Sequence, residues 1–222
     1  MRDPSRSLKP TDRYPGYDVL AKRNGPSWNA KTRQVISRRL AITSEPRYFN
    51  ADEFATVQAL AELIVPQPAD RPPVPVAALI DDRLHLGKSD GYRLPNMPRD
   101  GEAWKRGVAA LDAEARAAHG RRFAELSKPL QTELIERMQR DELSDPAWGE
   151  MQPSQFWKRR LGRDVVMAYY AHPSAWSEIG WGGPASPRGY VRLDFNDRDP
   201  WEAAEAEGFD DDTARRINRG VR

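Results

Sequence analysis

The sequence predicts a mainly α-helical fold, a single domain of orthogonally packed helices with an extended N-terminal arm and an irregular C-terminal segment. Apolar residues recur at spacings of three and four over much of residues 27–171, as in helices that bury one face. Helix start and stop signals bound these segments. The only segment with some alternation of apolar and polar residues, the mark of a strand, is residues 190–195.

The clearest helix is predicted within FNADEFATVQALAELIVP. Asn50 is placed to cap it, Glu53 stands three residues later, and Phe49 and Phe54 occupy the positions of a hydrophobic staple. Pro66 is expected to end this helix.

The same period predicts further helices over residues 27–40, 75–86, 102–120, 128–139, 154–172 and 211–218. The helix that ends near residue 120 has Gly120 as its natural terminator. Prolines between residues 66 and 75 predict a rigid, extended connector. Residues 87–101 form a loop that is long for a compact domain.

Three parts are expected along the chain: an extended arm over residues 1–26, a helical domain over 27–202, and a tail with a short helix over 203–222. The arm is rich in proline, glycine and charge. It carries too little apolar area to offset its own ordering entropy, so another surface should hold it.

Composition excludes several functions. The chain has no cysteine, which removes thiolate nucleophiles, thiolate-held metals and disulfides. Its 35 basic and 33 acidic residues give a net charge of +2, so nucleic-acid binding, which needs clustered cations, is not expected. The runs Lys158-Arg159-Arg160 and Arg215-Arg216 are interpreted as solvated helix faces.

Neither an export signal nor a membrane span is predicted. Residues 1–30 lack the apolar run of a signal peptide, and no segment approaches the roughly 20 apolar residues of a membrane helix. A cytoplasmic location is expected, or a periplasmic one if a signal-bearing partner exports the chain.

Catalytic and metal-binding patterns are weak. His85, His119 and His172 belong to no metal motif and are interpreted as helix-end or surface residues. His172 with Glu178 could act as acid and base, but their spacing defines no geometry, and structural roles are favoured. No GxSxG nucleophile motif is present. The GWGGP sequence is followed by prolines, which remove the donors that a phosphate site needs.

Residues 169–193, YYAHPSAWSEIGWGGPASPRGYVRL, combine aromatic residues, glycines and prolines without a helical period. Glycines permit unusual turns, prolines lower the entropy of a free loop, and large rings dominate binding energies when enclosed. The segment is therefore interpreted as a surface for another protein. The alternative is that it packs against the chain's own helices.

AYYAHPSAWSEIGWGGPASPRGYVRL resembles the C-terminal signature of the gluconate 2-dehydrogenase subunit 3 family, and FNADEFATVQALAELIVPQ is similar to that family's start. The resemblance covers residues 47–202. It implies a noncatalytic small subunit in a heterodimer with a glucose-methanol-choline type flavoprotein, whose large subunit holds FAD and oxidises a sugar, polyol or other alcohol. A cytochrome c subunit often takes the electrons and is a further candidate partner. Many family members begin with a twin-arginine signal, whereas this sequence begins with a polar arm.

The resemblance implies no catalytic, cofactor-binding or metal-binding residue in this chain, and assigns its signature positions to the subunit interface. These positions are Tyr169, Tyr170, His172, Pro173, Trp176, Glu178, Ile179, Gly180, Gly182, Gly183, Pro184, Pro187, Gly189 and Tyr190. Tyr14, Tyr17 and Trp28 are expected to form a second interface. The alternatives are an independent enzyme that uses His172 and Glu178, or a helical module that binds an unrelated partner.

Overall fold

The computed structural model of the chain describes residues 13–42, 45–69, 71–91, 94–184, 189, 199–206 and 210–221. Two compact units are present. We call Ile42–Tyr169 the central unit, and Met1–Ala41 together with Tyr170–Arg222 the terminal unit. The mainly α-helical class is confirmed, and the described residues contain no strand. The strand candidate at 190–195 lies outside the described residues.

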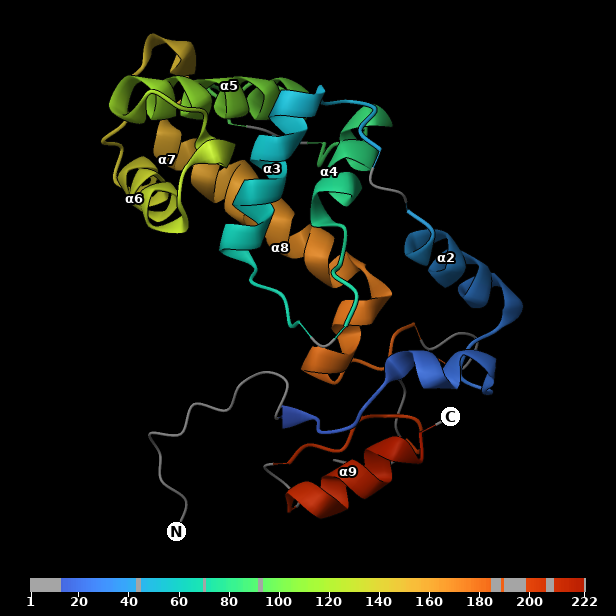
Figure 1. The fold of residues 1–222 in the computed structure, drawn as a ribbon. Coiled ribbons are helices and arrows are strands. Elements are labelled where there is room, and N and C mark those ends of the chain that lie inside the picture. Colours follow the sequence, from blue (N-terminus) through green and yellow to red (C-terminus); the bar gives the residue numbers. More distant parts are fainter. Residues whose placement is uncertain are drawn as a thin grey trace. The chain divides into compact units, whose positions relative to one another are not determined.

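The central unit holds most of the long helices, with α5 crossing α3 at one end (Figure 1). Its elements are α3 (Ala51–Ile64), α4 (Val76–His85), α5 (Asp100–His119), η2 (Phe123–Glu125), α6 (Lys128–Gln139), η3 (Pro146–Trp148), α7 (Pro153–Phe156), η4 (Trp157–Leu161) and α8 (Gly162–Ala171), of which Tyr170 and Ala171 are assigned to the terminal unit. None of the helices in the described part of the chain is long and apolar enough to cross a membrane.

Helix α3 begins as its sequence predicts. The Glu53 backbone N–H donates to the Asn50 side chain at 2.9 Å, and the Asn50 backbone N–H donates to the Glu53 carboxylate at 2.8 Å. This reciprocal capping box satisfies two N–H groups that would otherwise lack partners. Phe49 and Phe54 are both buried, which holds the predicted staple residues in the core.

Helix α5 ends at Gly120, which has φ 70° in the left-handed region, as predicted. Its buried face packs against α7 at Gly107, where an added Cβ would lie 2.4 Å from Cζ of the Phe156 ring. The absence of a side chain at Gly107 therefore lets the Phe156 ring lie directly on the α5 backbone. Trp104 meets the same ring edge-on, with centroids 5.6 Å apart.

The helix predicted over residues 154–172 forms as one continuous run of α7, η4 and α8 (Figure 1). Its middle section, η4, is a π-helix, in which hydrogen bonds reach one residue further than in an α-helix. Lys158 and Arg159 are exposed, as expected of a solvated face. For Arg160 that expectation is wrong, because its side chain is only 8% exposed and pairs with buried carboxylates.

The terminal unit joins segments from both ends of the sequence. Its elements are η1 (Val19–Asn24), α2 (Ala30–Leu40), η5 (Pro173–Ile179) and α9 (Asp211–Arg219). Its core consists of Tyr17, Val19, Trp28, Ile36, Trp176 and Val221. This arrangement differs from the predicted arm, domain and tail, because apolar residues of the arm share one core with residues of the C-terminal segment and the tail.

A buried asparagine connects these segments. The Asn218 side-chain amide donates to the Pro15 and Ala204 carbonyls, each at 3.0 Å, and its oxygen accepts from the Ala204 N–H at 2.7 Å. All the hydrogen-bonding groups of this side chain are thereby occupied, as burial of an amide requires. Asn218 is thus a fixed link between the N-terminal segment and α9.

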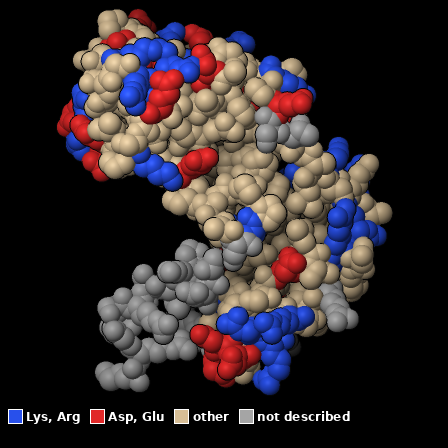
Figure 2. All heavy atoms as spheres, viewed as in Figure 1, with Lys and Arg blue, Asp and Glu red and all other residues tan. Residues whose placement is uncertain are grey.

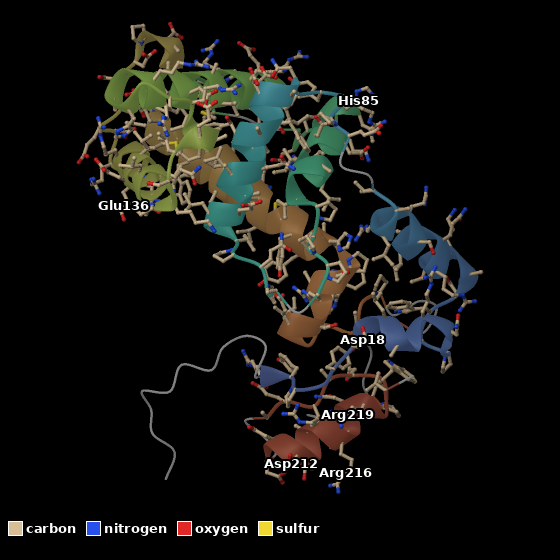
Figure 3. All side chains as sticks on the ribbon, viewed as in Figure 1. Asp18, His85, Glu136, Asp212, Arg216 and Arg219 are labelled. Carbon is tan, nitrogen blue, oxygen red and sulfur yellow. The ribbon has the colours of Figure 1, made fainter. Side chains whose placement is uncertain are left out.

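Helix α9 carries its charges in the order that favours a helix. Acidic residues such as Asp212 lie in its first turn, and Arg216 and Arg219 lie in its last (Figure 3). Figure 2 shows the red and blue side chains of this helix gathered toward opposite ends. Carboxylates at the N-terminus and cations at the C-terminus both interact favourably with the helix dipole.

Candidate functional site

The signature segment of the terminal unit begins with the short helix η5, which is capped at both ends. The His172 Nδ1 accepts from the Ser174 backbone N–H at 3.4 Å, and Gly180, at φ 64°, ends the helix. His172 is only 6% exposed. The geometry thus gives His172 the structural, helix-end role that the sequence favoured over acid–base chemistry.

Trp176 lies at the centre of this segment and is fully buried. Its indole N–H donates to the Tyr170 carbonyl at 2.7 Å, and its ring meets Trp181 edge-on with centroids 4.5 Å apart. Tyr17 and Trp28 belong to the same core cluster. These predicted interface residues therefore fill the chain's own core, in agreement with the alternative interpretation, and their contact with a partner stays a prediction.

Two glycines of the signature allow rings to lie against the backbone. An added Cβ at Gly183, which has φ 71°, would be 2.9 Å from Cζ2 of Trp28 and 3.0 Å from Cζ3 of Trp176. At Gly180 it would be 2.4 Å from Cε1 of Tyr14. The sequence suggested adaptable glycines, whereas here they permit close packing and fix the segment in place.

A buried lysine lies beneath this segment. The Lys22 ammonium is 3.2 Å from the position that a Cβ on Gly182 would occupy, and 5.4 Å from the centroid of the Trp28 ring. Burial lowers the pKa of Lys22 to about 8, although the charges of Glu202 and Asp199 act to raise it. The favourable cation–π contact with Trp28 only partly offsets the loss of hydration.

Raising the pH from 7 to about 9.5 is expected to increase the stability contributed by Lys22, by an amount on the order of 2 kcal/mol. The unfolded chain keeps its Lys22 proton up to the ordinary pKa of 10.5, whereas the folded chain releases it near 8. The unfolded state therefore binds more protons between these values, and stability rises with pH there.

Denaturant unfolding of the full chain, followed by tryptophan fluorescence at each pH, measures this effect. Lys22→Met should be more stable than the wild type at pH 7 and should lose this part of the pH dependence. Lys31→Met, at an exposed position of α2, is the control that should retain it. Identical pH profiles for wild type and Lys22→Met would contradict the burial of a charged amine.

The exposed apolar part of the signature lies at the end of η5. Ile179 is 45% exposed and Trp181 is 38% exposed, so these two side chains are available to a partner. Tyr169 lies in the central unit, buried, where its hydroxyl accepts from Arg71 Nη2 at 2.6 Å. Of the remaining predicted positions, Pro173 is buried, and five are half-buried: Tyr14, Tyr170, Glu178, Gly182 and Pro184. Gly189 has φ 80°. Pro187 and Tyr190 lie outside the described residues.

The central unit contains a buried charge cluster that the sequence analysis missed. Arg160 Nη1 lies 2.8 Å from Asp100 and Arg160 Nη2 lies 3.1 Å from Asp90. Arg83 lies 3.1 Å from Asp164 and 2.7 Å from Asp90. The signal that could have revealed this cluster is a charge on an apolar helix face: Asp164 lies beside Val165 and Arg160 beside Leu161, all four of them buried.

Burial and pairing act in opposite directions on these carboxyl groups. Burial raises the pKa of Asp164, although the hydrogen bond from the Trp104 indole at 2.9 Å and the charges of Arg160 and Arg83 oppose this. For Asp90, burial also acts to raise the pKa, but the hydrogen bond from Arg163 and the neighbouring arginines lower it overall. Because each carboxylate has a cationic partner, the cluster fixes α4, α5 and α8 together.

The two histidines of the central unit lie at helix ends. No group of three or more histidine, cysteine, aspartate or glutamate residues in the described part of the chain could hold a metal ion. His85 is the last residue of α4 (Figure 3), and His119 is the last of α5. A hollow of about 640 Å³ lies between the proline-rich connector and α3 and α4, and its described lining contains no histidine, serine or threonine.

The comparison with protein families matches the chain over residues 51–183 to the family described as Gluconate 2-dehydrogenase subunit 3. No curated protein and no solved structure matches it. The matched region begins at the first residue of α3, directly after the N-cap Asn50, and ends at Gly183, so it includes the buried charge cluster and η5. Since this region is more than half of the chain, the protein belongs to the gluconate 2-dehydrogenase subunit 3 family.

Proposed function

We propose that this protein is a noncatalytic small subunit that binds and stabilises the large subunit of an FAD-dependent dehydrogenase of the glucose-methanol-choline type. The large subunit would oxidise a sugar, polyol or other alcohol. The observation that carries the proposal is the family match over residues 51–183, because the family is described as a subunit of a dehydrogenase.

The proposal assigns FAD to the large subunit because the glycine-rich turn at Gly182 and Gly183 does not fit the cofactor. A dinucleotide site needs a glycine-rich turn that opens a helix, so that backbone N–H groups meet the phosphates. Here Gly182 and Gly183 are followed by Pro184, whose backbone nitrogen carries no hydrogen to donate to a phosphate. Gly183 instead packs against Trp28 and Trp176, which leaves no room for a phosphate over its backbone.

The terminal unit supports a binding role at Ile179 and Trp181. Both side chains extend from a segment that the η5 caps and the buried Trp176 hold in a fixed conformation. A pre-ordered surface loses little conformational entropy on binding, and tryptophan is enriched among residues that dominate binding energy. We therefore place the main contact with the large subunit at these two residues.

Co-expression with any flavoprotein dehydrogenase subunit whose gene is adjacent to the gene of this chain, followed by gel filtration, tests the proposed function. A yellow, dye-reducing complex that contains both chains is expected. The chain alone should show no flavin spectrum and no turnover. Separate elution of the two chains, or turnover by this chain alone, would overturn the proposal.

Trp181→Ala and Ile179→Ala are each expected to weaken this complex by about 10- to 100-fold, as truncation of a central aromatic or aliphatic anchor does. Leu86→Ala, at a side chain that is 52% exposed in the central unit, is the matched control and should leave the dissociation constant unchanged. Titration calorimetry measures binding, and thermal unfolding of each variant verifies the fold. Equal binding by all three variants would show that the main contact with the large subunit is not at Ile179 and Trp181.

A further inference from the structure

The helical run from α7 to α8 exposes one face that, apart from the pairing of Arg163 with Asp90, none of the preceding roles uses. Lys158, Arg159 and Arg163 are exposed on it, followed by Val166 at 41% and Met167 at 49% exposure. Arg163 stands four residues after Arg159 and three and four residues before Val166 and Met167, which places these side chains along one side of the helix, and Lys158 adjoins Arg159. We call these five residues the basic helix face.

The π-helical turn η4 separates the cations of this region into two groups. Arg160 turns inward to the buried carboxylates, whereas the neighbouring Lys158 and Arg159 stay in solvent. Within the described residues, neither Lys158 nor Arg159 has an ion-pair partner, while Arg163 pairs with Asp90. Turns of π-helix within α-helices are rare and often lie at functional positions.

The basic helix face carries no negative charge of its own. The only acidic residue between positions 153 and 171 is Asp164, which is 3% exposed and belongs to the buried cluster. Exposed cations beside exposed apolar side chains are complementary to a surface with carboxylates around an apolar centre. A symmetric contact between two copies of this chain would instead bring like charges together, which disfavours self-association through this face.

We propose that the basic helix face is a docking surface for an acidic, apolar-centred patch on the dehydrogenase large subunit. The inference rests on the proposed function and adds to it a second contact, in the central unit, with a stated partner chemistry. Val166 and Met167 bury their exposed apolar surface against the apolar centre of the partner's patch, and Lys158 and Arg159 pair with its carboxylates. Charge pairing of this kind acts mainly on the association rate and on partner choice.

The test measures binding of the large subunit to Lys158→Glu/Arg159→Glu by surface plasmon resonance at two salt concentrations. The double variant is expected to lower the association rate at least tenfold at low salt and to reverse the salt dependence seen for the wild type. Arg116→Glu/Arg121→Glu makes the same charge change at exposed positions of the same unit and should change the association rate much less. Val166→Ala/Met167→Ala should raise the dissociation rate while leaving the salt dependence intact.

Three outcomes would overturn the inference. Equal effects of the Lys158/Arg159 and Arg116/Arg121 reversals would show a general charge effect without a docking surface. Charge-dependent binding of the chain to vesicles of phosphatidylglycerol and phosphatidylcholine, with the complex insensitive to the reversal, would assign the face to a membrane. A wild-type chain that forms no complex at all would remove the proposed function together with this contact, and is distinguished by the absence of binding at any salt concentration.

Discussion

Asp164→Ala is expected to lower the free energy of unfolding by about 3 to 5 kcal/mol, because it breaks a buried ion cluster from one side. The Asp164 carboxylate accepts from the Trp104 indole at 2.9 Å and lies 3.1 Å from Arg83 and 3.6 Å from Arg160. Its side chain is 2% exposed. Removal of the carboxylate would leave Arg83 and Arg160 with one fewer negative partner for their buried charges, and the Trp104 indole N–H without its acceptor.

Urea unfolding of the full chain measures this loss. Asp164→Asn retains an acceptor for Trp104 but removes the charge, so it should fall between wild type and Asp164→Ala. Arg140→Ala, which breaks only pairs with exposed Glu136 and Glu142, should change stability little because exposed pairs are screened by water. If Asp164→Ala were as mild as Arg140→Ala, the cluster would not be a buried network.

Helices with local start and stop signals were predictable from the sequence. The Asn50 and Glu53 capping box and the Gly120 terminator act through the backbone of their own helix, so neighbouring residues carry the information. Apolar periodicity found the buried faces of α3 and α5 for the same reason. The cap at Asp18, at the start of η1, was not recognised (Figure 3), because no apolar period follows it.

The terminal unit was harder to predict because its contacts join residues far apart in sequence. Trp28 and Trp176 share one core, and Asn218 bonds to the carbonyl of Pro15. The local sequence around one residue of such a pair does not indicate which distant residue it contacts. Helix η5 was also missed, since a short 3₁₀ turn that begins at Pro173 has too few residues to show a period.

The sequence predicts residues 169–193 as one partner surface and assigns all their side chains to the same environment. Aromatic residues without a helical period satisfy the composition of an interface and of an irregular core equally well. Only the fold separates Trp176, which is fully buried, from Trp181, which is 38% exposed. The same ambiguity hid Arg160, which pairs with buried carboxylates while its basic neighbours Lys158 and Arg159 stay exposed.

Gly183→Ala is expected to lower the free energy of unfolding by about 3 kcal/mol. A side chain at φ 71° in the left-handed region costs about 1 to 2 kcal/mol, and the new methyl group would lie 2.9 Å from Trp28 and 3.0 Å from Trp176. Both rings are buried, so neither can move aside without disturbing the core of the terminal unit, and such overpacking adds about 1 to 3 kcal/mol.

Gly87→Ala supplies the matched control for Gly183→Ala. Gly87 has φ 61° and no atom within 4 Å of an added Cβ, so alanine there carries the backbone strain without the steric clash. The difference between the two variants in urea unfolding therefore isolates the packing against Trp28 and Trp176. A reduced near-UV circular dichroism signal should accompany Gly183→Ala alone, because the environment of its two tryptophans changes. Equal losses of stability would mean that these rings do not hold the signature segment, and the fixed platform that presents Ile179 and Trp181 would have to be abandoned.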